Sequence, residues 1–203
     1  MAERVYNFAS GPAVLPLPAM EEAQRDLLAL PGVGSSILEI SHRSKPFLAI
    51  IEAAEANLRQ LLGIPGNYKV LFLQGGARLQ FAMLPMNFLP KGSSADYVLA
   101  GTWGKTANTE ALTQGKTRVV WDGQSCAYRR MPAQEELDLD PGAAYLHITS
   151  NETIQGIQIS SEPDSGNVPL FCDSSSDFLH RKVPVERYGV LYACAQKNAG
   201  PAG

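Results

Sequence analysis

The amino-acid sequence predicts an α/β fold, a three-layer αβα sandwich built around a mostly parallel β-sheet. Short apolar runs alternate along the chain with segments whose apolar residues recur at helical spacing, which is typical of parallel strands joined by helices. The composition agrees, because 45% of the 203 residues are hydrophobic and 18% are charged, as in a globular protein with a sizeable core.

Charge and segment length exclude several classes of partner. The net charge of -3 gives no general attraction for nucleic acid or an anionic membrane. No apolar run reaches the roughly 18 residues of a membrane span, and Glu3, Arg4 and Asn7 stand where a signal peptide would be apolar. The cysteines and histidines show no metal-ligand spacing. We therefore expect a soluble, cytoplasmic protein without a metal.

The first third of the chain is expected to form an arm and two helices. Residues 1–17 contain a Ser-Gly-Pro turn and a further proline, which favour an extended arm lying over another part of the molecule. Helical spacing of apolar residues predicts one helix over residues 18–30, ended by Pro31 and Gly32. It predicts a second helix over residues 45–62, ended by Gly63.

The rest of the chain is expected to alternate strands and helices. Helices are predicted over residues 76–88 and 103–112. Strands are predicted over residues 68–73, 96–100, 116–121, 145–148, 169–172 and 189–193, the last ending near Ala195. This order implies a mostly parallel sheet with helices on both faces.

Lys197 follows the last apolar run, so it would lie at the carboxyl end of a buried strand. Carboxyl ends of parallel strands are where open α/β sheets bind ligands. Small, partly apolar neighbours such as Ala195 and Ala199 would desolvate the amine and keep it available as the nucleophile of a Schiff base. The alternative is a solvent-exposed lysine that opens a loop.

Four other predicted strands also end in candidate ligand groups. These groups are the Gly75-Gly76-Ala77-Arg78 turn, Trp103, Thr153 and Asp173. The glycine turn suits a phosphate, because glycines let N–H groups approach an anion and a helix amino end adds partial positive charge. Each group also has an alternative role that involves no ligand. The glycine turn could simply join a strand to a helix, and the Trp103 indole could pack in the core. The Thr153 hydroxyl could cap a turn, and Asp173 could cap a helix.

His42 and Arg43 are a further candidate pair. Both are either surface residues or, together with Arg78, part of a pocket for a doubly anionic substrate, because guanidinium groups match carboxylate and phosphate.

In a parallel sheet, the groups after the five strands converge on one edge. Together they comprise an amine, a carboxylate, an indole that could stack on a ring, a hydroxyl and a turn that could bind phosphate. Pyridoxal 5'-phosphate needs a lysine for its aldehyde, an aspartate that keeps the pyridine nitrogen protonated, and a helix amino end for its phosphate. We therefore expect this cofactor.

Five blocks of the sequence resemble one known family. They are NFASGPAVLP at residues 7–16, EISHRS at 39–44, LFLQGGARLQF at 71–81, NETIQG at 151–156 and YGVLYACAQKNAGPAG at 188–203. They closely resemble the phosphoserine aminotransferases, which are class V enzymes of fold type I with pyridoxal phosphate. The resemblance implies a homodimer in serine biosynthesis. It also implies transfer of the amino group between L-glutamate and 3-phosphohydroxypyruvate, giving O-phospho-L-serine and 2-oxoglutarate.

The resemblance also implies roles for individual residues. The lysine that binds the cofactor aldehyde falls on Lys197 and the partner of the ring nitrogen on Asp173. The remaining cofactor contacts fall on Gly76, Ala77, Arg78, Trp103, Thr153 and Gln196. The residues that bind the anionic groups of the substrate fall on His42, Arg43 and Arg78, and some of them act across the subunit interface.

The chain departs from the family in two respects. It has Ala77 where the family commonly has a third glycine, and family members continue well past residue 203. We therefore expect an amino-terminal arm over residues 1–17, an incomplete cofactor-binding large domain over residues 18–203, and no carboxyl-terminal domain. Two alternatives stay open: another fold-type I pyridoxal-phosphate enzyme such as a lyase or desulfurase, and an inactive or weakly cofactor-binding fragment.

Overall fold

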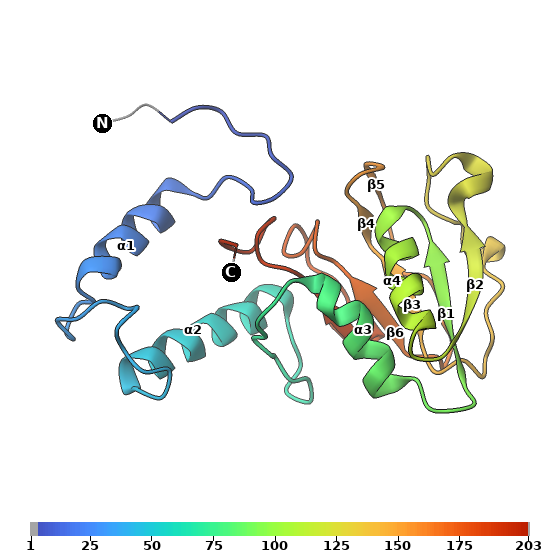
Figure 1. The fold of residues 1–203 in the computed structure, drawn as a ribbon, viewed down its shortest axis with the longest axis horizontal. Coiled ribbons are helices and arrows are strands. Elements are labelled where there is room, and N and C mark those ends of the chain that lie inside the picture. Colours follow the sequence, from blue (N-terminus) through green and yellow to red (C-terminus); the bar gives the residue numbers. More distant parts are fainter. Residues whose placement is uncertain (1–3, 203) are drawn as a thin grey trace.

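The computed structural model describes residues 4–202 and is built around a five-stranded sheet (Figure 1). The strands are β1 (Ser94–Leu99), β2 (Lys116–Asp122), β3 (Leu146–Thr149), β6 (Leu170–Asp173) and β7 (Tyr188–Tyr192). Their order is β2-β1-β3-β6-β7, and every neighbouring pair is parallel. The predicted parallel sheet is therefore confirmed, although β7 ends at Tyr192, before the Ala195 expected from the apolar run.

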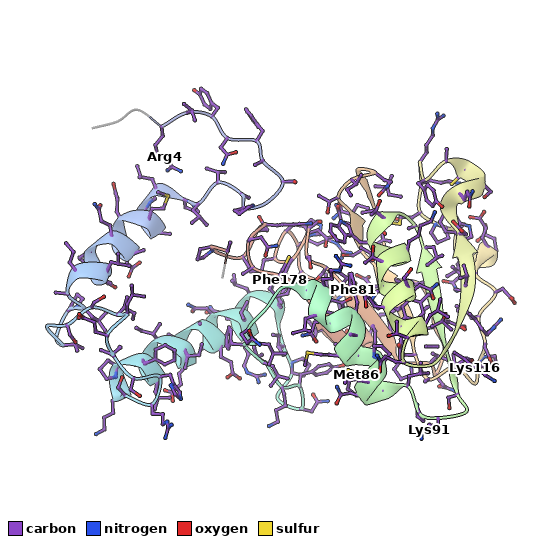
Figure 2. All side chains as sticks on the ribbon, in the orientation of Figure 1. Arg4, Phe81, Met86, Lys91, Lys116 and Phe178 are labelled. Carbon is purple, nitrogen blue, oxygen red and sulfur yellow. The ribbon has the colours of Figure 1, made fainter. Side chains whose placement is uncertain are left out.

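One face of the sheet packs against two helices, α3 (Ala77–Phe88) and α4 (Thr102–Leu112). Phe81, labelled in Figure 2, is buried from α3 against Tyr97 of β1 and Phe171 of β6. Ala107 and Ala111 of α4 are buried in the same cluster, and their small side chains let that helix lie close to the strands. Both helices agree with the prediction.

The opposite face is covered by irregular chain and short 3-10 helices. Its core includes Val98, Ile148, Leu170 and Cys172, with Leu137 packed against them. The 3-10 helices are η1 (Gly123–Cys126), η2 (Gln134–Glu136) and η3 (Val185–Arg187). A two-stranded antiparallel hairpin, β4 (Asn151–Glu152) with β5 (Ile157–Gln158), extends from the end of β3. Among residues 4–202, α3 and α4 therefore lie on one face, whereas irregular chain and 3-10 helices cover most of the other.

The strand predicted over residues 68–73 is wrong. This segment is irregular chain without ladder pairing, and Leu71, Phe72 and Leu73 remain 72%, 49% and 54% exposed. The segment contacts the sheet through a side chain, because the Tyr68 hydroxyl donates a hydrogen bond to the Tyr188 carbonyl of β7 at 2.9 Å. An apolar run shows that a segment suits a strand, but pairing also depends on how the rest of the chain places that segment, which local sequence does not specify.

Two further helices, α1 (Leu17–Leu28) and α2 (Lys45–Leu62), extend away from the sheet (Figure 1). Gly63 ends α2 in the left-handed conformation with φ 67°, as its sequence predicts. The arm before α1 is extended, and it reaches the carboxyl-terminal segment, where the Ala13 N–H donates to the Gln196 carbonyl at 2.9 Å. The contact at Ala13 agrees with an arm that reaches another part of the molecule, whereas Val5, Tyr6 and Phe8 are 85%, 94% and 93% exposed. None of the helices in the described chain is long and apolar enough to cross a membrane.

Candidate active site

Lys197 lies in a turn that follows β7. The carbonyl of Ala195 accepts bonds from the N–H groups of Ala199 and Gly200, at 3.1 and 2.9 Å, which closes the turn around the lysine. The amine Nζ donates to Thr153 Oγ1 at 2.7 Å and to Ser176 Oγ at 2.9 Å. Lys197 is therefore held in place and is not the exposed loop lysine of the alternative.

The two hydroxyl groups come from different strand ends. Thr153 follows β4 and Ser176 follows β6, and the two hydroxyls also bond to each other. The sequence singled out Thr153 but not Ser176. The one signal for Ser176 was the run of three serines at residues 174–176, directly after Asp173.

Asp173 ends β6 and is 4% exposed. Its Oδ1 accepts from the backbone N–H of Ser175 at 2.9 Å and from the Ser175 hydroxyl at 2.6 Å. Burial raises the pKa of Asp173 above its ordinary value, although the bonds from Ser175 and the positive charge of Lys197 act in the opposite direction. Within residues 4–202 both recorded bonds go to Oδ1, which leaves Oδ2 available to a ligand.

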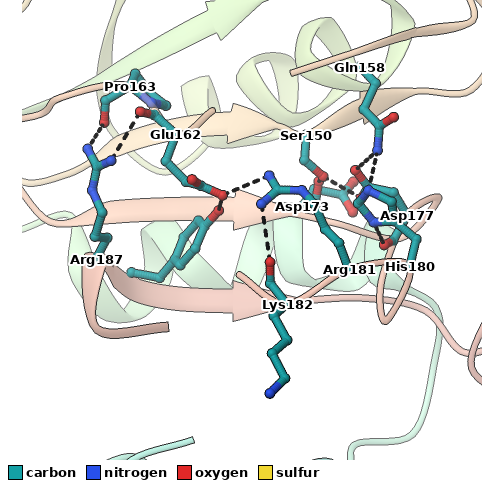
Figure 3. Close-up of polar contacts among 11 residues, drawn as sticks. Ser150, Gln158, Glu162, Pro163, Asp173, Asp177, His180, Arg181, Lys182 and Arg187 are labelled. Carbon is teal, nitrogen blue, oxygen red and sulfur yellow. Dashed lines mark hydrogen bonds and ion pairs between the residues drawn. The ribbon is translucent and has the colours of Figure 1, made fainter. Parts of the chain in front are cut away.

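A polar network behind Asp173 fixes its backbone (Figure 3). The Ser150 hydroxyl is 3.2 Å from the Asp173 carbonyl and donates to Asp177 Oδ1 at 2.6 Å. Gln158 Nε2 donates to Asp177 Oδ2 at 2.8 Å, and His180 Nδ1 contacts the Asp177 carbonyl at 2.5 Å. The negative charge of Asp177 also contributes to raising the pKa of Asp173.

Trp103 lies in the first turn of α4, beside Lys197. The amine of Lys197 is 5.6 Å from the centroid of the indole ring, within the range of a cation–π contact. Glu152 Oε2 accepts a bond from the Trp103 backbone N–H at 2.8 Å. The sequence did not identify Glu152, although it precedes Thr153 directly.

The Gly76-Ala77-Arg78 turn begins α3. Gly76 is the N-cap, and α3 has no side chain that caps its first N–H groups, so these donors suit an anion. A Cβ at Gly76 would meet nothing within 4 Å, so the backbone there is open. The Arg78 side chain is 70% exposed and lies 3.4 Å from Glu110 of α4, so its recorded partner is a surface carboxylate.

His42 and Arg43 lie on the exposed connection between α1 and α2, where Arg43 Nε approaches His42 Nε2 at 3.4 Å. The 18 residues of α2 span about 27 Å, and the pair is at the end of α2 that points away from the sheet (Figure 1). One chain therefore does not bring this pair to Lys197. Their expected contact with substrate stays a prediction that involves a second copy.

The arm adds a contact that the sequence did not reveal. Gly11 packs against Lys197, since a Cβ at Gly11 would lie 3.0 Å from Lys197 Cγ and 3.6 Å from Gln196 Cγ. The φ of Gly11 is 154°, a value that residues with side chains rarely adopt. The Gln196 carbonyl accepts a bond from the arm, and the expected contact of Gln196 with the cofactor stays a prediction.

The fold and this strand-end cluster define a class of protein. Residues 5–203 match the class-V aminotransferase family, and the chain belongs to that family. Within it, the chain is 53% identical to a phosphoserine aminotransferase of Laribacter hongkongensis over 199 residues, which are 98% of this chain and 55% of that protein.

Solved structures give the same result. The structure of the phosphoserine aminotransferase from Bacillus circulans subsp. alkalophilus matches with a TM-score of 0.96 and 48% identity, over 100% of this chain and 56% of that one. A phosphoserine aminotransferase studied for radiation damage of its Schiff base matches with a TM-score of 0.97 and 46% identity, with the same coverage. The chain spans about half the length of the relatives it matches.

Proposed function

We propose that this chain is the cofactor-binding part of a phosphoserine aminotransferase that uses pyridoxal 5'-phosphate. The observation that supports this most directly is the Lys197 amine, held by Thr153 and Ser176 beside the Trp103 ring. The names of the relatives agree with it, and one of the matched phosphoserine aminotransferases contains a Schiff base.

The residues present fit this cofactor in three respects. Asp173 offers a buried carboxylate oxygen, α3 offers an uncapped amino end, and Lys197 offers a fixed amine. A protonated ring nitrogen beside Asp173 Oδ2 would offset the cost of burying that carboxylate, which the raised pKa of Asp173 reflects.

When bound, the cofactor supplies an aldehyde and a ring that withdraws electrons from the substrate. The Lys197 Nζ would hold the aldehyde carbon, with the aldehyde oxygen leaving as water, and the free amine would move a proton at the substrate Cα as general base and acid. Asp173 would hold the proton on the ring nitrogen, and Trp103 would fix the plane of the ring. Gly76, Ala77 and Arg78 would bind the phosphate at the uncapped start of α3.

The substrates under this proposal are L-glutamate and 3-phosphohydroxypyruvate, and the products are O-phospho-L-serine and 2-oxoglutarate. His42 and Arg43 bind the anionic groups of the substrate from a second copy in a homodimer, since in one chain they precede α2, whose first turn points away from the sheet (Figure 1). A cytoplasmic location, a role in serine biosynthesis, and the division into an arm over residues 1–17 and a large domain over residues 18–203 belong to the same proposal.

The test is to add pyridoxal phosphate to the purified chain and to record the absorbance of the lysine-bound cofactor. Borohydride reduction and peptide mapping should then place the cofactor on Lys197. Lys197→Ala should abolish the signal, whereas Lys105→Ala, at a lysine that lies over Tyr128, should retain it. Labelling of another lysine would contradict the assignment.

A second candidate is a fragment that binds cofactor weakly or not at all. The exposed side chains of Leu71, Phe72 and Leu73 favour it, because apolar surface of this kind is usually covered in a complete protein. This candidate is supported if residues 1–203 do not bind the cofactor but a longer chain does.

A further inference from the structure

The helix that presents Trp103 has no cap of its own. Its N-cap residue is Gly101, which has no side chain to accept a bond from the first N–H groups of α4. Uncapped N–H groups at a helix start need another acceptor when they are buried, because an unpaired buried donor is costly.

The acceptors come from the turn between β4 and β5. Glu152 Oε2 accepts from the Trp103 N–H and Glu152 Oε1 from the Gly104 N–H, both at 2.8 Å. Gln155 Oε1 accepts from the Thr102 N–H at 3.2 Å, and Gln155 Nε2 donates to the Thr102 hydroxyl at 2.9 Å. Three consecutive N–H groups of α4 are therefore bound by a segment about 50 residues further along the chain.

Two glycines make room for this carboxylate. A Cβ at Gly101 would lie 2.7 Å from Glu152 Cδ, and a Cβ at Gly104 would lie 3.2 Å from Glu152 Oε1 and 2.7 Å from the Val98 carbonyl. Glu152 is 0% exposed. A buried carboxylate in direct contact with a helix amino end is favoured by the partial positive charge there.

We propose that Glu152 is a positioning residue that sets the orientation of the Trp103 indole. Its neighbour Thr153 binds the amine of Lys197, so two consecutive residues hold two of the groups assigned to the cofactor site. The orientation of Trp103 follows from contacts within this chain, and its consequence for the cofactor ring rests on the proposed function.

The first test uses the chain without cofactor. Trp103 and Trp121 are its two tryptophans, so Trp121→Phe leaves Trp103 as the single indole fluorophore. In that background, Glu152→Gln keeps the size of the side chain but places an amide donor against a backbone N–H. We expect a red shift of the Trp103 emission and an increase in its quenching by acrylamide, because the first turn of α4 loosens.

Glu162→Gln is the matched control. Glu162 is also buried and hydrogen-bonded, through Tyr188 and Arg181, but it does not contact α4 in the described structure. A loss of stability alone would affect both variants, whereas only Glu152→Gln should change the Trp103 emission. Gln155→Ala should shift the Trp103 emission in the same direction. If Glu152→Gln does not fold, the emission of Gln155→Ala is the measurement that tests the positioning role.

The second measurement is the affinity for pyridoxal phosphate. Glu152→Gln should weaken it by no more than about tenfold, because the lost charge-assisted bond acts on the cofactor only through Trp103, while borohydride still labels Lys197. Unchanged Trp103 emission in Gln155→Ala and in folded Glu152→Gln would overturn the positioning role. Absence of cofactor labelling on Lys197 in the parent chain would overturn the proposed function instead, and the emission result would stand by itself.

Discussion

Lys197 Nζ lies 2.7 Å from Thr153 Oγ1, although the two residues are 44 positions apart in the sequence. The bond depends on β4 and the turn after β7 meeting at the same edge of the sheet. It links the amine to the segment whose preceding residue, Glu152, caps α4.

Thr153→Val should therefore weaken attachment of pyridoxal phosphate to Lys197. Valine keeps the shape of threonine but loses the acceptor, and a bond of about 1 kcal/mol corresponds to roughly fivefold in affinity. The measurement is the fraction of Lys197 reduced by borohydride as the cofactor concentration rises. Thr149→Val is the control, because the Thr149 hydroxyl is buried without a partner in the described residues, so its loss should not affect Lys197. An equal effect of both changes would contradict the role of Thr153.

Gly11→Ala should displace either the arm or the lysine. The added Cβ would lie 3.0 Å from Lys197 Cγ, and the φ of 154° is unfavourable for alanine. We expect slower and weaker attachment of cofactor to Lys197, measured as in the previous experiment. Gly66→Ala is the matched control, since a Cβ there meets nothing within 4 Å. If Gly11→Ala behaves like Gly66→Ala, the arm does not constrain the lysine.

Asp173→Asn should separate stability from cofactor binding. Burial raises the pKa of Asp173, so the folded state favours the protonated form, and the stability contributed by that form is lost as the pH rises through the folded-state pKa. At pH 7 the neutral amide should therefore raise the free energy of unfolding of the cofactor-free chain by about 1 kcal/mol, while Oδ1 still accepts from Ser175.

Urea unfolding without cofactor, at pH 7 and at lower pH, measures this effect. The gain should shrink as the pH falls toward the ordinary aspartate range, and cofactor binding should weaken at every pH. A variant that is less stable than the parent at pH 7 would show that the carboxylate is stabilising in the apo state.

The elements of the fold were predictable where local sequence determines them. Helical spacing and the glycine after Leu62 predict α2, and short apolar runs predict the five strands of the sheet. The run at residues 71–73 looks the same locally but forms no ladder, although β7 is an edge strand of the sheet. Pairing depends on where the rest of the chain lies, so this error could not be detected from the run itself.

The site was predictable as far as strand ends determine it. Asp173 ends β6, Lys197 follows β7, and Thr153 follows β4 of the hairpin that extends from the end of β3, so these residues meet at the carboxyl edge of the parallel sheet. Ser176, Glu152 and Gly11 were missed because their roles depend on contacts between distant segments. The proposed roles of His42 and Arg43 depend on a second copy, which one chain does not determine.

His147 gives the last prediction, because it is a histidine buried in the centre of the sheet. Its Nε2 is 2.8 Å from the Tyr192 hydroxyl, its ring stacks on Tyr97 at 4.9 Å, and Nδ1 has no partner in the described residues. Burial lowers the pKa of His147 to about 3. The folded state therefore holds this ring neutral, whereas an unfolded histidine binds a proton near pH 6.5.

The unfolded chain consequently binds more protons than the folded chain between about pH 6.5 and pH 3, so the contribution of His147 to stability is complete above pH 6.5 and is lost as the pH falls. From pH 7.5 to pH 5 the loss is on the order of 2 kcal/mol for this one group. His147→Gln retains a bonding group for Tyr192 but does not titrate, so its free energy of unfolding should fall less steeply over that range. Urea unfolding at several pH values measures the two slopes, and parallel curves for parent and variant would show that His147 is not the group that destabilises the fold in acid.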